Sequence, residues 1–221
     1  MRYQGDWRRR TPDVLRCRPE RGVLVDSRGG ELGLGREVGD WDVDGLWDLV
    51  VARANREGEC RFFFHKNVGD REHPSFAEPE IISIDGGEMM SERNRTGIVS
   101  ITVSDWLGDG RPHLLVGIGG DKDGKVLLFE NMALGDGDEP RLTDGRPLTL
   151  KDGTDLTLPR AVLANPVVVD WDGRGRKDLL VGSHRGLLHL FRDEGTQGSR
   201  PALLPHETIR IEPSSSSTEV G

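Results

Sequence analysis

Several features that define common classes of protein are scarce or missing in this sequence. The 221 residues include only two cysteines, Cys17 and Cys60, which are too few for a small disulfide-stabilised scaffold. Aromatic residues make up 5% and hydrophobic residues 34% of the chain, so we expect a thin core or many small ones. No run of about 18 apolar residues occurs, which excludes a membrane-spanning helix. Apolar residues at helical spacing are also missing, which argues against a helical bundle.

The charge of the chain narrows the choice of partners. The formal net charge is −8, and binding to phosphate backbones requires a basic surface, so nucleic acid is not expected as a partner. The same acidity is compatible with binding cations. Glycine is abundant, with 30 residues, about twice its average share.

Internal repetition is the strongest signal in the sequence. The dipeptide Asp-Trp begins at Asp40, Asp105 and Asp170, at a constant spacing of 65 residues. Each occurrence opens a block rich in aspartate and glycine that ends in Leu-Val-Val or Leu-Leu-Val-Gly. Three copies at one spacing predict a repeated structural unit.

Each repeat contains short apolar runs bounded by Gly, Asp and Asn, a pattern typical of strands. The run after each acidic block is almost continuously apolar, as expected for a strand with both faces covered. About four antiparallel strands per repeat predict an all-β fold built of three four-stranded β-propeller blades. The predicted strands cover 99–103 and 166–169 before the blocks, 49–51, 114–116 and 179–181 after them, then 61–64, 125–129 and 187–191, and last 81–84, 147–150 and 206–211.

The repeats divide the chain into predicted blades at 31–96, 97–161 and 162–212. The arginine-rich segment 1–30 is interpreted as a loop or frayed end or as the remnant of a preceding blade, and the Ser-rich segment 213–221 as a disordered tail. Propellers typically close with about four to eight blades. We therefore expect a partial propeller that either associates with itself or is completed by further blades.

The first acidic block has the pattern D-x-D-x-D-G-x-x-D, with acids at Asp40, Asp42, Asp44 and Asp48. Carboxylates this close repel one another unless a cation compensates them. Calcium accepts about six to eight oxygens, and a glycine at the sixth place allows the required sharp turn. Leu46, at the seventh place, could add its carbonyl. We expect a calcium site of weak to moderate affinity here, the alternative being a solvated acidic turn without metal.

The second block is less complete. It retains Asp105 and Asp109, but Leu107 and His113 stand where the first block has acids. Two carboxylates make a poor calcium cage. The sequence therefore predicts at most a weak metal site in this block.

The third block retains Asp170, Asp172 and Asp178 but has Arg174 at its third acidic place. A guanidinium at this position can neutralise the acids directly through ion pairs. We predict a metal-free loop held by salt bridges to Arg174.

A tryptophan follows the first aspartate of every block, at Trp41, Trp106 and Trp171. A structural unit that repeats must also repeat its packing. These side chains are therefore predicted to pack between neighbouring blades, with ligand stacking as the alternative.

These residues resemble the FG-GAP/VCBS repeats of integrin alpha chains and many bacterial secreted proteins. The resemblance rests on the D-x-D-x-D-G-x-x-D loop with its apolar run, and on the segment Leu190–Thr196, and it covers 31–211. It implies a calcium-stabilised propeller, extracellular or at the cell surface, that serves recognition, adhesion or scaffolding with a protein or glycan ligand. The family's calcium ligands correspond here to Asp40, Asp42, Asp44, the Leu46 carbonyl and Asp48, and in part to Asp105, Asp109, Asp170, Asp172 and Asp178.

Catalytic and cofactor-binding motifs are not recognisable in the sequence. The six histidines lack zinc-site spacing, and neither a G-x-S-x-G elbow nor a phosphate-binding loop is present. Enzymatic activity stays open, although a non-catalytic protein is favoured. The alternatives are a polysaccharide lyase or hydrolase, or a lectin, built on a propeller of this family.

Overall fold

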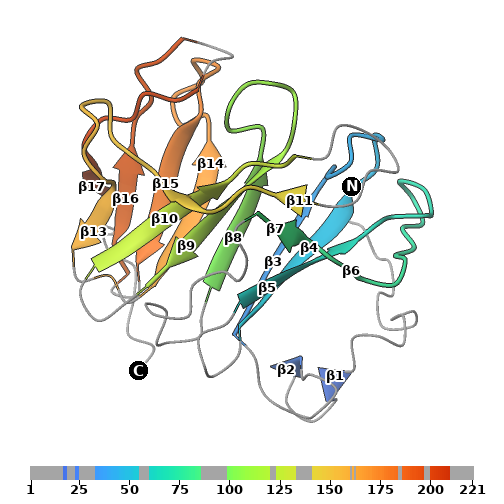
Figure 1. Cartoon of the computed structure of the whole chain (residues 1–221). Helices are drawn as coiled ribbons and strands as arrows, with labels where there is room; N and C mark the ends of the chain where they lie inside the picture. The colour runs from blue at the N-terminus through green and yellow to red at the C-terminus, as the bar shows by residue number, and fades with distance from the viewer. Residues whose placement is uncertain are drawn as a thin grey trace, which may run out of the picture.

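The protein is all-β throughout the residues that its computed structural model describes. None of these residues lies in a helix, so none offers a helix that could cross a membrane (Figure 1). The described residues are 17–18, 23–24, 33–54, 60–85, 99–119, 123–132, 141–159, 161, 163–183, 186–196 and 200–209.

The first sheet has four antiparallel strands in chain order. They are β3 (Gly33–Gly39), β4 (Asp48–Ala54), β5 (Cys60–His65) and β6 (Glu80–Ile81). The strands predicted at 49–51 and 61–64 are confirmed, whereas β3 has three glycines and no apolar run that would have identified it.

The second sheet has five strands where four were predicted. They are β8 (Val99–Ser104), β9 (His113–Ile118), β10 (Asp123–Phe129), β12 (Arg146–Pro147) and β13 (Thr157–Pro159). Both β12 and β13 pair with β10, at different positions along it. The strand expected at 147–150 is thus shorter and starts earlier, and β13 was not predicted.

The third sheet repeats the pattern of the first. Its antiparallel strands are β14 (Ala164–Val169), β15 (Asp178–Ser183), β16 (Leu188–Phe191) and β17 (Glu207–Ile209). Two small pairings complete the described structure: the hairpin β1 (Cys17–Arg18) and β2 (Val23–Leu24), and the parallel pair β7 (Ser83–Ile84) and β11 (Arg141–Leu142). Otherwise the segments 1–30 and 213–221 lie outside the described residues.

The three large sheets lie side by side in chain order, and β8 of the second sheet contacts both β3 of the first and β14 of the third (Figure 1). Two glycines permit this approach. A Cβ added to Gly35 would lie 2.9 Å from the Val99 carbonyl oxygen, and one added to Gly117 would lie 1.8 Å from the Ala164 carbonyl oxygen. No sheet closes on itself within the described part of the chain.

Two hydrophobic cores fill the spaces between successive sheets. Strand β9 supplies both, because its side chains alternate: Leu114 and Val116 face the first sheet, and Leu115 faces the third. All six residues of β9 are buried. The prediction that this strand is covered on both faces is confirmed.

The repeated tryptophans differ in their surroundings. Trp41 belongs to the first core and Trp106 to the second, and each is 2% exposed. Trp171 is 44% exposed, because no described residue forms a further sheet beyond the third. Packing between sheets is confirmed for two of the three side chains.

Candidate functional site

Each acidic block forms the loop between the first and second strands of its sheet. The sixth residue has a positive φ in all three loops, 87° at Gly45, 82° at Gly110 and 73° at Gly175, which explains the glycine at this place. The fourth residue is also left-handed. It is glycine in the second and third loops, but Val43 in the first, where φ is 61°.

The ninth residue of the first loop closes that loop onto the end of the sheet's third strand. Asp48 is fully buried. Its Oδ2 accepts the Trp41 N–H at 2.9 Å, and its Oδ1 accepts the Asn67 N–H at 2.8 Å. We call this pair of contacts the loop clasp.

The third sheet has the same loop clasp. Asp178, fully buried, accepts the N–H of Trp171 at 3.1 Å and the N–H of Asp193 at 2.7 Å. Asn67 and Asp193 are structurally equivalent, because the side-chain Oδ1 of each accepts two further backbone N–H groups. The ninth acid is thus a structural acceptor in both loops.

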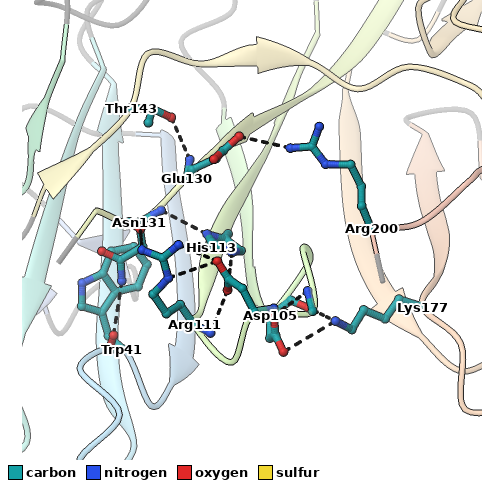
Figure 2. A network of polar contacts seen from close by, with 11 residues as sticks. Trp41, Asp105, Arg111, His113, Glu130, Asn131, Thr143, Lys177 and Arg200 are labelled. Carbon is teal, nitrogen blue, oxygen red and sulfur yellow. Dashed lines mark hydrogen bonds and ion pairs between the residues drawn. The ribbon is translucent and has the colours of Figure 1, made fainter. Parts of the chain in front are cut away.

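In the second sheet a histidine replaces the acid of the loop clasp. His113 is fully buried, and its Nδ1 accepts the Asn131 N–H at 3.1 Å (Figure 2). This contact requires an unprotonated Nδ1, so Nε2 carries the proton and donates to Asp109 Oδ1 at 3.1 Å. The sequence suggested only that an acid had been lost here, whereas the geometry shows that the imidazole takes over one of the acid's two contacts, the one to the end of the third strand. The Trp106 N–H donates instead to the Ser104 carbonyl oxygen, at 2.7 Å.

The first loop brings three of its four acids together. One ligand oxygen each from Asp40, Asp42 and Asp48 lies within 4.8 Å of the others. Asp40 Oδ1 and Asp42 Oδ1 are buried and accept no hydrogen bond from the described part of the chain. Asp44 lies outside this cluster, and its Oδ1 accepts the Leu46 N–H at 2.8 Å.

A lysine that the sequence analysis did not single out neutralises part of the first loop. The Lys66 ammonium contacts Asp42 Oδ2, and it lies 2.9 Å from Asp44 Oδ2. This hydrogen bond is the main reason that the pKa of Asp44 is lowered. Burial raises the pKa of Asp48, and repulsion from Asp42 and Asp44 raises it further. The two backbone hydrogen bonds to Asp48 lower this pKa but do not outweigh burial. Lys66 therefore provides some of the compensation that the sequence argument assigned to metal.

The acids of the second loop are paired with bases. Arg111 donates to Asp109 Oδ2 from Nη2 at 2.6 Å, and Lys177, from the third loop, contacts the Asp105 carbonyl (Figure 2). Burial alone would raise the pKa of Asp109, but the hydrogen bonds from Arg111 outweigh it and lower the pKa to about 2. Asp105, Asp109 and His113 still offer a three-atom cluster, so the weak metal site stays a prediction.

The third loop joins Asp172 to two arginines. Arg174 Nε lies 2.5 Å from Asp172 Oδ1, and Arg192 Nη1 lies 3.2 Å from Asp172 Oδ2. Asp170 accepts the backbone N–H groups of Arg174 and Gly175, which fixes the turn. The expected Arg174 ion pair is present with Asp172, and the prediction that the loop holds no metal stands untested.

The residue just after the third strand of each sheet matches in charge the third position of the acidic loop, a relation that the fold reveals. Lys66 and Arg192 occupy matching places there and pair with the third-position acids Asp42 and Asp172. The second loop has Leu107 at that third position, and its matching residue is Glu130, which pairs instead with Arg200 (Figure 2). The available sequence signal was a charged residue one or two places after the last phenylalanine of each third strand.

We expect the His113 clasp to weaken in mild acid. Burial lowers the pKa of His113 below its value of 6.5 in the unfolded chain. As the pH falls below about 6.5, the unfolded state takes up a proton that the folded state resists, so stability is lost by up to about 1.4 kcal/mol per pH unit. Urea unfolding at pH 7.5 and pH 5 should show this loss, and it should shrink in His113→Asn. An equal loss in both proteins would contradict the assignment.

Comparison of the sequence with family models and with curated proteins yields no relative from which a function could be transferred. No family model matches the chain, and no curated protein is significantly similar to it in sequence. The geometry of the three loops is therefore the basis on which a function is proposed below.

Proposed function

We propose that this chain is a calcium-binding module of propeller-type repeats, related to the FG-GAP/VCBS repeats, that serves recognition, adhesion or scaffolding without catalysis. The observation that carries the metal site is the pair of buried oxygens, Asp40 Oδ1 and Asp42 Oδ1, which lack a described hydrogen-bond donor. Burying an anionic oxygen without a partner is costly. A divalent cation between these oxygens and Asp48 would remove that cost.

The donor set fits calcium better than softer metals. Every candidate atom is a carboxylate or carbonyl oxygen, and hard cations prefer oxygen ligands. In this proposal Asp40, Asp42 and Asp48 hold the ion, with Asp44 and the Leu46 carbonyl as further donors. Lys66 has a long, flexible side chain, and it would leave Asp42 and Asp44 when the ion binds.

The serial packing of the sheets supports the propeller. Their first strands are adjacent, and the same tryptophan position packs against the following sheet twice. The third sheet also has a tryptophan at this position, Trp171, although no further sheet follows it among the described residues. Trp171 is thus the contact that a further blade, from this or another chain, would cover. The extracellular or cell-surface setting belongs to the same proposal.

Calcium titration tests the metal site. By calorimetry we expect one site with a Kd of about 10⁻⁴ to 10⁻³ M. Calcium at about 100 times Kd should stabilise the fold by about 2.7 kcal/mol and raise Tm by about 5–10 °C. Asp40→Asn and Asp42→Asn should abolish both effects, while Asp172→Asn, in the third loop, should leave them intact.

Two further outcomes are decisive. If Lys66 competes with the ion, Lys66→Ala should tighten calcium binding, because the acids then lose their internal counter-charge. No binding heat and no shift of Tm in either wild type or Lys66→Ala would refute the metal site.

A further inference from the structure

A pocket of about 530 Å³ lies beside the first acidic loop, apart from the cluster of metal-site oxygens. This volume is within the range of about 300–1,000 Å³ that is usual for small-molecule sites. Its lining includes Val38, Trp47, Asp70, Arg71, Pro74 and Phe76.

Trp47 is the unusual element of this pocket. Its side chain is 72% exposed, whereas Trp41, six residues earlier in the same loop, is fully buried. The matching positions one and two periods later are Pro112 and Lys177, so an indole here is not part of the repeated packing. Val38, which is 51% exposed, lines the same pocket, so Trp47 belongs to an exposed apolar patch, and such patches mark binding sites.

The backbone around Trp47 is held in place from both sides. Trp47 follows Leu46, whose N–H is bound by Asp44, and precedes Asp48 of the loop clasp. The backbone that carries the indole is therefore fixed. A side chain on a fixed backbone loses less entropy when a ligand binds than one on a mobile loop.

The rim of the pocket offers a donor next to an acceptor. The Arg71 guanidinium is held by the Gly45 carbonyl, at 3.2 Å from Nε and 3.0 Å from Nη2. Asp70 Oδ1 accepts the N–H groups of Glu72 and His73, and these bonds lower the pKa of Asp70, which stays charged at neutral pH. Arg71 and Asp70 thus present one cationic donor and one anionic acceptor, both exposed.

We propose that this pocket binds a neutral pyranose ring. One face of a pyranose is a flat layer of C–H groups that suits the electron-rich face of an indole. Its edge carries neighbouring hydroxyls, each both donor and acceptor, which match the Arg71–Asp70 pair. The net charge of −8 disfavours an anionic sugar, and the adjacent guanidinium disfavours a cationic one.

The inference extends the proposed function, because it names the ligand class that a recognition module would take. Gly45 links the two sites: its N–H donates to Asp40 Oδ2 at 3.0 Å, and its carbonyl accepts Arg71. An ion in the metal site should therefore reduce the mobility of Gly45 and of Arg71 at the pocket rim. The pocket residues are nevertheless separate from the metal cluster, so either site can fail alone.

Titration with methyl pyranosides of glucose, galactose, mannose and N-acetylglucosamine tests the proposal, with and without calcium. The readout is the indole N–H signals in nitrogen-15 NMR, where Trp47 is assigned from its loss in Trp47→Phe. We expect at least one pyranoside to shift the Trp47 signal saturably. Trp47→Ala should weaken that binding at least tenfold, Trp47→Phe should weaken it less, and Trp171→Ala should not change it.

The outcomes separate this inference from the calcium proposal. Trp47→Ala should retain the wild-type Tm and the wild-type calcium heat. Absence of any saturable shift, or equal affinity in wild type and Trp47→Ala, would overturn the sugar site, even if calcium still binds. Sugar binding in a protein that shows no calcium heat would uphold the pocket and reject the metal site.

Discussion

Replacing Trp106 with alanine should lower the free energy of unfolding by about 3–5 kcal/mol, as expected for a large aromatic side chain removed from a core. Trp106 is 2% exposed and fills the core between the second and third sheets. Trp171→Ala, at the same place in the repeat, should cost less than about 1 kcal/mol, because that side chain is 44% exposed. The two variants remove the same atoms from the same repeat position and differ only in what covers them.

Urea unfolding of the two variants and wild type measures this contrast. Trp41→Ala, from the first core, should behave like Trp106→Ala. Equal losses for Trp106→Ala and Trp171→Ala would mean that something covers the third sheet in solution. Analytical ultracentrifugation at the same protein concentration would then show whether the cover is a second copy of the chain.

Removing the carboxylate of Asp178 should cost about 2–5 kcal/mol, because it leaves the N–H groups of Trp171 and Asp193 without their acceptor. Asp178 is fully buried and its contact with the Asp193 N–H is buried too, so at least this donor is left without an acceptor in the folded protein. The third loop is suited to this test, because Arg174 and Arg192 already neutralise Asp172, one of its two other acids.

Asp172→Ala is the matched control from the same loop. The Asp172 side chain is part-exposed and its partners are arginines at the surface, so its loss should cost no more than about 1 kcal/mol. Asp178→Asn should fall between the two, because its amide retains one acceptor while its NH₂ faces the other backbone donor. Similar losses for Asp178→Ala and Asp172→Ala would show that the loop clasp is not a stabilising contact.

The loop clasp also changes how acidic repeat loops are interpreted. In sequence, the ninth aspartate looks like a fourth metal ligand. In the fold, both oxygens of Asp48 and of Asp178 already serve backbone N–H groups. A loop of this type therefore needs its last acid for folding whether or not that acid also contacts a cation, and the buried oxygens of the first two acids are the better sign of a cation site.

Local chemistry made part of this protein predictable. Apart from β3, the strands around the acidic blocks could be placed, because fixed spacing, apolar runs and glycine turns can be recognised from adjacent residues. The glycine of the sixth position was predicted for the same reason, since a left-handed turn depends on one residue. The short strands β6, β12 and β13 were placed poorly or missed, because two or three residues on a sheet edge have no distinct pattern.

The sequence by itself determined that three equivalent all-β units recur and that aspartates gather in the turn of each. Only the tertiary structure decided what those aspartates contact. Lys66 comes 22 residues after Asp44, and Asn67 comes 19 residues after Asp48, yet strand pairing brings each against its partner. The exposure of Trp171 was likewise decided by the presence or absence of a following sheet, because burial is a property of neighbours and not of the residue itself.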